Sequence, residues 1–149
     1  LWALPLAFLV LGSLVAFYPI FMGNGQVLAQ TLLSGQSIPY LPLTLAVKGL
    51  IVYLLLRNGA YGGTLTPSFA LGIGSGYLVT LLMTVVGIHL DPALGMLLGA
   101  TVFLGTTLQA PLTAIALSLG FTGQFLSLTI PLVLATGVSY VIRKRWEKR

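Results

Sequence analysis

The sequence has very few charged residues, and their scarcity excludes a soluble domain. Only 6% of its 149 residues are Asp, Glu, Lys or Arg, about a quarter of the share found in soluble proteins, and the mean hydropathy is +1.04. Six of the nine charged residues fall among the last seven positions, which leaves Lys48, Arg57 and Asp91 for the first 142 residues. So few charges cannot keep a globular surface hydrated. The composition therefore indicates a polytopic membrane protein.

Cysteine is absent and titratable side chains are scarce, which excludes several kinds of site. Without cysteine there is no disulfide framework, thiol nucleophile or thiolate metal site. One histidine and two acidic residues cannot form a metal shell of side chains. A general acid–base pair needs two positioned titratable groups, and no serine or threonine has a histidine at a recognisable spacing. We therefore expect no metal, no cofactor and no enzymatic activity.

The charge that is present lies at the carboxyl end. The net charge is +5, and +4 of it comes from residues 143–149. A basic segment after an apolar one is typical of a cytoplasmic anchor. The rest of the sequence contains no basic patch with interleaved aromatic residues, so nucleic-acid binding is not indicated. We expect residues 1–142 to form the transmembrane region and residues 143–149 a basic cytoplasmic tail, in a plasma or inner membrane. Leu1 opens the chain inside an apolar run without an initiator Met, so we expect a part of a larger protein.

Apolar segments of unequal length alternate with glycine-rich breaks, which predicts an all-α membrane protein with tilted, partly re-entrant helices. A bilayer core needs about 20 residues of helix, and shorter segments persist only when they are buried in protein or line a cavity. Leu1–Met22 is long enough to cross as one helix. The other predicted segments are Val27–Leu33, Leu41–Leu56, Pro67–Ile88, a helix that Asp91 caps and Pro92 opens, Pro111–Gly120, and Phe125–Ile142 with an interruption at Pro131.

Two pairs of glycines have the spacing of a close helix contact. Gly72 and Gly76 form one G-x-x-x-G pair, and Gly95 and Gly99 form another. Glycine faces let helix backbones approach closely in a membrane. The pairs therefore predict tight packing between two of the helices.

A glycine-rich turn leads directly into a predicted helix and offers backbone amides rather than charged side chains. The turn comprises Gly62, Gly63, Thr64, Leu65, Thr66 and Pro67, with Thr66 suited to the N-cap and Pro67 to the first helical position. The N–H groups at a helix start have no intrahelical acceptor, and that end carries about half a positive charge. Such an end binds anions, and broken helices hold ions in many transporters. An anion site and an ordinary capped turn are both consistent with the pattern.

The same residues resemble the signature of a known family. Gly62–Pro67, followed by Ser68–Gly72, is similar to the G-G-x-F-x-P motif and the apolar helix after it in the CLC chloride channel and H⁺/Cl⁻ antiporter family. Gln109–Ile115 resembles a second family stretch, R-A-P-L-T-G-I. The glycine-rich turn at 23–26 and the basic Lys48 also stand where the family has such features. The resemblance covers nearly the whole chain.

The resemblance implies a fold, a function and partners. CLC subunits consist of two inverted helical halves and pair as homodimers, with one pore in each subunit, and this chain is similar to the second half. Chloride or a related anion is then held by the backbone amides of Thr64 and Leu65, with Lys48 as an electrostatic contributor. The implied partners are the missing amino-terminal half, the lipid bilayer and a second copy of the chain, which Pro111–Leu119 and Leu128–Ile142 contact.

The sequence departs from the family pattern at three points, and other functions compete with anion transport. Leu65 replaces a phenylalanine, Gly120 replaces an acidic residue, and no residue matches the pore tyrosine of many members.

Channel and proton-coupled antiporter both remain open. The alternatives are a small self-assembling ion channel and a non-transporting membrane subunit. Lys48 is also consistent with snorkelling toward the membrane surface or with pairing to a backbone carbonyl, and His89 with a solvated loop.

Overall fold

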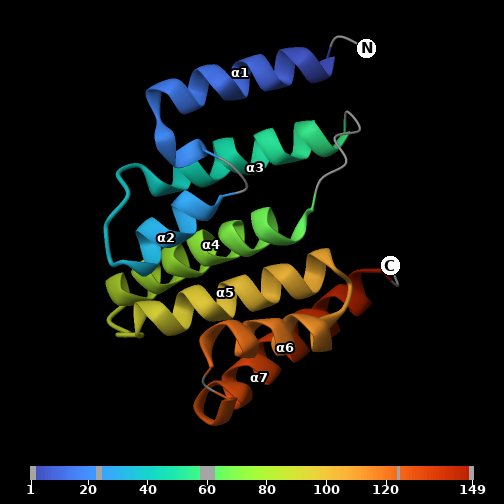
Figure 1. Cartoon of the computed structure of the whole chain (residues 1–149). Coiled ribbons are helices and arrows are strands. Elements are labelled where there is room, and N and C mark those ends of the chain that lie inside the picture. Colours follow the sequence, from blue (N-terminus) through green and yellow to red (C-terminus); the bar gives the residue numbers. More distant parts are fainter. Residues whose placement is uncertain (1–2, 23–24, 58–62, 124, 148–149) are drawn as a thin grey trace.

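The helices of the chain lie side by side in an order close to that of the sequence. The computed structural model describes residues 3–22, 25–57, 63–123 and 125–147, and every regular element among them is helical. Figure 1 shows α1, α3, α4 and α5 as successive rods, with α2 beside α4 and with α6 and α7 below α5. The predicted all-α fold is confirmed. The elements are α1 (Ala3–Phe17), the 3₁₀ helix η1 (Pro19–Phe21), α2 (Gln26–Leu33), α3 (Leu41–Arg57), α4 (Leu65–Val85), α5 (Pro92–Thr107), α6 (Pro111–Thr122) and α7 (Phe125–Trp146).

Local signals in the sequence explain where several helices begin and end. The Asp91 carboxylate accepts a hydrogen bond from the backbone N–H of Ala93 over 3.1 Å, and Pro92 is the first residue of α5, as predicted. Pro111 opens α6 in the same way, because the missing N–H of a proline costs no helical hydrogen bond there. Gly123 ends α6 with φ 65°, a left-handed conformation that glycine adopts without strain.

The prediction of one spanning helix over Leu1–Met22 is wrong. Helix α1 ends at Phe17, and Tyr18 is extended with φ −134°. Pro19 then begins the short helix η1. The cause is local, since the residue before a proline is disfavoured in the helical conformation.

The two helices at the carboxyl end are longer than the sequence predicted. Helix α6 continues past Gly120, and α7 runs through Pro131 without a break and on to Trp146. Membrane helices tolerate an internal proline because neighbouring groups satisfy the freed carbonyl. The basic residues in the last turn of α7 also interact favourably with the negative end of the helix dipole.

Among the described residues, α4 is the only helix long and apolar enough to cross a bilayer by itself. The other apolar helices have 10–17 residues. This agrees with the expectation that several segments are too short to cross alone. Such helices must be buried in protein or line a cavity.

The contact between α4 and α5 is made by the two G-x-x-x-G pairs, as predicted. A Cβ atom on Gly72 would lie 2.5 Å from the Cα of Ala100, and one on Gly76 would overlap the carbonyl oxygen of Gly95. The two antiparallel helices therefore pack backbone against backbone. Buried residues of four helices extend this contact into a core that also holds α2 against α4: Leu28, Leu32, Leu41, Ile73, Met96 and Ala100.

A buried hydroxyl pair joins α5 to α6 and gives a testable stability prediction. Thr101 donates to the Oγ of Ser118 over 2.7 Å, and both residues have 0% exposure. We expect Thr101→Val to lower the free energy of unfolding by about 1 kcal/mol, the usual size of an interhelical hydrogen bond in membranes. Unfolding in sodium dodecyl sulfate measures the loss. The control Thr106→Val removes a hydroxyl that bonds only within α5, and an equal loss in both variants contradicts the prediction.

Candidate anion-binding site

The predicted anion-binding turn lies at the amino end of α4, but the helix begins two residues earlier than expected. Thr64 is the N-cap and Leu65 the first helical residue, in place of Thr66 and Pro67. The N–H of Ser68 donates to the carbonyl oxygen of Thr64 over 3.1 Å, which closes the first turn. Pro67 therefore falls at the third helical position, where an N–H has no intrahelical acceptor and its absence costs nothing.

This geometry leaves three consecutive backbone N–H groups at the start of α4. The N–H groups of Thr64, Leu65 and Thr66 precede the first intrahelical hydrogen bond. Thr64 and Leu65 are half-buried, and Thr66 is exposed. The three donors lie at the positive end of a helix of 21 residues. They are the kind of group that binds an anion without a formal cation.

A groove of about 260 Å³ lies between the first turns of α4 and the helix α2. Its walls are mainly apolar, with the hydroxyl of Thr66 and two glutamine amides as polar groups. Uncharged polar groups of this kind suit an ion that must be released as well as bound. The lining residues are Gly25, Gln26, Ala29, Gln30 and Leu33 from α2 and the residue before it, and Leu65, Thr66, Phe69 and Ala70 from α4.

A close contact at Gly25 holds the start of α2 against α4. Gly25 is the N-cap of α2 and has φ 90°, a conformation that strains other residues. A Cβ atom there would lie 2.6 Å from the Cβ of Ala70. Only glycine fits this position, and it brings the amino ends of α2 and α4 to the same groove.

Lys48 lies beside the start of α2. Its side chain is 3% exposed, and its Nζ donates to the carbonyl oxygen of Phe21 over 2.7 Å. Its Cε is 3.8 Å from the place of a Cβ atom on Gly25. The pairing with a backbone carbonyl is thus confirmed, and the electrostatic contribution of Lys48 to anion binding stays a prediction.

The structure does not bring the remaining titratable residues to this site. His89 is exposed in the loop between α4 and α5, as predicted, and Asp91 caps α5 in the same region. Both follow the last turn of α4, whereas Thr64 precedes its first turn. Figure 1 shows these two ends of α4 on opposite sides of the bundle. Gly62, the first residue of the predicted site, lies outside the described residues, and Gly63 is exposed.

Sequence reasoning missed the contribution of α2 to this groove. It treated Val27–Leu33 as a short apolar stretch, whereas Gln26 and Gln30 of α2 line the groove beside the turn, together with Phe69 of α4. A signal was present, because residues four apart lie on one face of a helix and Gln26 and Gln30 have that spacing. The contact of this face with α4 depends on tertiary packing.

A larger cavity suits an anion less well. It measures about 640 Å³ and lies near the start of α5, where Asp91 and Ser127 are the polar residues among mainly apolar walls. The Asp91 carboxylate repels an anion at that end. The groove at Thr66 is smaller, but helix amino ends and neutral polar groups surround it.

Comparison with known proteins assigns the chain to a family. It is 29% identical over 128 residues to the H(+)/Cl(-) exchange transporter ClcA of three strains of Vibrio cholerae serotype O1, over 84% of this chain and 27% of the relative. The chain thus spans about a quarter of the length of these relatives. No solved structure matches it. Residues 1–144 match the family described as voltage gated chloride channel, and the chain therefore belongs to this family of integral membrane proteins.

Proposed function

We propose that the chain forms one half of the anion pathway of a chloride transporter and binds the anion through backbone amides at the start of α4. The observation that carries the proposal is the first turn of α4, where the N–H groups of Thr64 and Leu65 precede the first helical hydrogen bond and where Leu65 lines the groove. The relatives named H(+)/Cl(-) exchange transporter support chloride as the anion. Transport rather than an enzymatic reaction is the activity that this site serves.

The chemistry of the site fits reversible binding. An anion at the turn receives hydrogen bonds from aligned amides that cost no reorganisation, and the dipole of α4 adds to them. The groove walls are mainly apolar, and a less polar surrounding than water strengthens both interactions. A lysine or arginine in direct contact would hold the ion more firmly and slow its release. Lys48 instead donates to a carbonyl and acts on the anion from a distance.

The proposed assembly has two further parts. An amino-terminal half completes the pathway, because the motifs of this chain resemble those of the family's second half. The chain spans only about a quarter of the length of its relatives. A second copy of the chain packs on α6 and α7, whose large apolar side chains include Leu112 (80% exposed), Ile130 (69%) and Leu134 (63%). The carboxyl end faces the cytoplasm, because its basic residues follow an apolar helix.

The substitution Thr64→Pro tests the amide site in the complete protein. The backbone φ of Thr64 is −79°, which suits a proline. The substitution therefore removes one N–H and leaves both the helix and the charge unchanged. A hydrogen bond to a charged group contributes about 1.5 to 3 kcal/mol, and we expect chloride flux into liposomes to fall about tenfold or more. The thermal unfolding midpoint, measured in parallel, is expected to change little.

The matched control is Thr64→Ala, which keeps the N–H and removes a hydroxyl that makes no capping hydrogen bond. We expect its chloride flux to equal that of the parent protein. If Thr64→Pro folds and transports chloride as well as Thr64→Ala does, the amide site is wrong. Leu65→Pro is a weaker test, because it also disfavours the helical conformation of Thr64 before it.

A further inference from the structure

Apart from Lys48, which is buried in α3, the charged residues of the described chain lie at the two ends of the helix bundle. Arg57 ends α3, and Arg143, Lys144 and Arg145 lie in the last turn of α7. Figure 1 shows the end of α3, the start of α4, the end of α5 and the carboxyl end of the chain on one side of the bundle. Asp91 lies on the other side, in the turn between α4 and α5. Glu147 follows α7 at the basic end, so the described residues there carry four positive charges and one negative charge, and the other end carries one negative charge.

The end of α7 is built from residues that suit a membrane–water interface. Tyr140 is 45% exposed and Trp146 80% exposed, on either side of the three cations. Tyrosine and tryptophan gather at headgroup level because their rings are amphipathic. Three apolar residues with exposed side chains, Val138, Val141 and Ile142, lie in the turns just before the cations. The apolar part of α7 thus ends where its cationic part begins.

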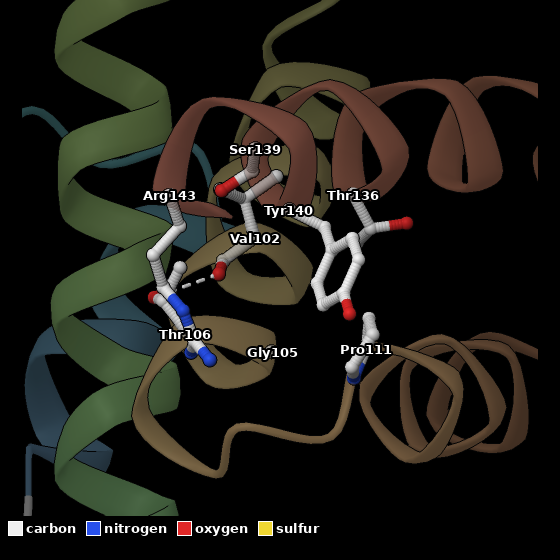
Figure 2. A pocket seen from close by; sticks show the side chains of 8 residues that line it. All are labelled: Val102, Gly105, Thr106, Pro111, Thr136, Ser139, Tyr140 and Arg143. Atoms are coloured by element: carbon white, nitrogen blue, oxygen red, sulfur yellow. Dashed lines mark hydrogen bonds between the residues drawn. The ribbon is translucent and has the colours of Figure 1, made fainter. Parts of the chain in front are cut away.

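The first of these cations has an ion-pair partner just after its own helix. The Nε of Arg143 lies 3.2 Å from a carboxylate oxygen of Glu147, one turn later. Figure 2 shows the Arg143 side chain beside Thr106 at the end of α5, with Tyr140 directed toward Pro111 at the start of α6. The cavity among these residues measures about 10 Å³, room for about one water molecule. The cations therefore act from the surface of the bundle rather than from a pocket.

We infer that the basic end of the bundle, Arg57 with Arg143, Lys144 and Arg145, binds the headgroups of anionic phospholipids in the leaflet it faces. Clustered cations directly after an apolar helix attract anionic lipid by about 1 kcal/mol for each Lys or Arg near the surface. The flanking aromatic residues select a lipid surface over a soluble acidic partner, because they occupy headgroup depth. The inference depends on membrane insertion and is independent of the anion site at Thr64.

Fluorescence quenching of Trp146 tests this inference in the complete protein. A version in which Trp146 is the only tryptophan is reconstituted into phosphatidylcholine vesicles with a minor fraction of brominated phosphatidylglycerol. We expect the quenching to correspond to a local phosphatidylglycerol fraction about fivefold or more above that of the bulk bilayer. Quenching that equals the bulk fraction overturns the inference.

Two variants separate the charge of this end from its structure. The triple variant Arg143→Gln, Lys144→Gln and Arg145→Gln is expected to lose the enrichment, while the double variant Arg143→Lys and Arg145→Lys keeps it. Quenching by brominated phosphatidylcholine, equal in all versions, shows that Trp146 keeps its depth. Asp91→Asn, a charge change at the other end, is expected to leave the enrichment unchanged. Enrichment that persists in the triple variant contradicts the inference.

Discussion

The substitution Gly76→Ala is expected to prevent α4 and α5 from packing and to lower the free energy of unfolding by about 3 kcal/mol, at the upper end of the usual cost of overpacking. The added Cβ overlaps the carbonyl oxygen of Gly95 and lies 3.1 Å from the Cα of Gly99. Backbone atoms cannot rotate away as a side chain can, so the helices must separate. Unfolding in sodium dodecyl sulfate, followed by circular dichroism, measures the change.

The matched control is Gly12→Ala in α1, where an added Cβ has no atom within 4 Å. Alanine has a higher helix propensity than glycine, so this variant is expected to be as stable as the parent or slightly more stable. The same increase in propensity acts at Gly76, and the difference between the two variants therefore isolates the cost of the backbone contact. Equal stability of the two variants contradicts the packing argument.

The elements that sequence reasoning predicted well are those determined by local chemistry. Asp91 and Pro92 define the start of α5 through a side-chain cap and a fixed backbone angle. The G-x-x-x-G pairs predicted a close contact because only a missing Cβ permits it. A buried lysine in an apolar helix needs an acceptor, and Lys48 has the carbonyl of Phe21. Only the start of α5 is encoded by neighbouring residues; for the glycines and for Lys48 the residue type predicts that a partner is needed, and tertiary packing supplies the partner.

The errors arose where two local readings are equally good or where distant segments decide. A proline fits any of the first helical positions, because none of those N–H groups has an intrahelical acceptor, so Pro67 gave no means of placing the start of α4. The continuation of α7 through Pro131 depends on the surrounding helices. The groove at the candidate anion site depends on the contact of Gly25 with Ala70, two residues whose pairing no local pattern predicts.

Lys48→Met is expected to weaken chloride binding about 15-fold. Lys48 lies beside Gly25, and Gly25 contacts Ala70. Ala70 follows Leu65 by five residues, which is about 7.5 Å along a helix. The ammonium group is therefore on the order of 10 Å from the start of α4. At an effective dielectric constant of about 20, a unit charge at that distance changes the binding free energy of an anion by about 1.7 kcal/mol. Isothermal titration of the complete protein with chloride measures the change.

The structural role of Lys48 must be separated from its charge. Methionine fills a similar volume but leaves the carbonyl of Phe21 without this donor, a loss of about 1 to 3 kcal/mol for a buried group. The control Lys48→Gln offers a neutral amide donor on a shorter side chain, so it too loses the charge. If charge acts on the anion, both variants weaken chloride binding to a similar extent, whatever their difference in stability. If chloride affinity is unchanged in both while their stability falls, Lys48 only holds the end of η1 in place, and the proposed amide site does not depend on its charge.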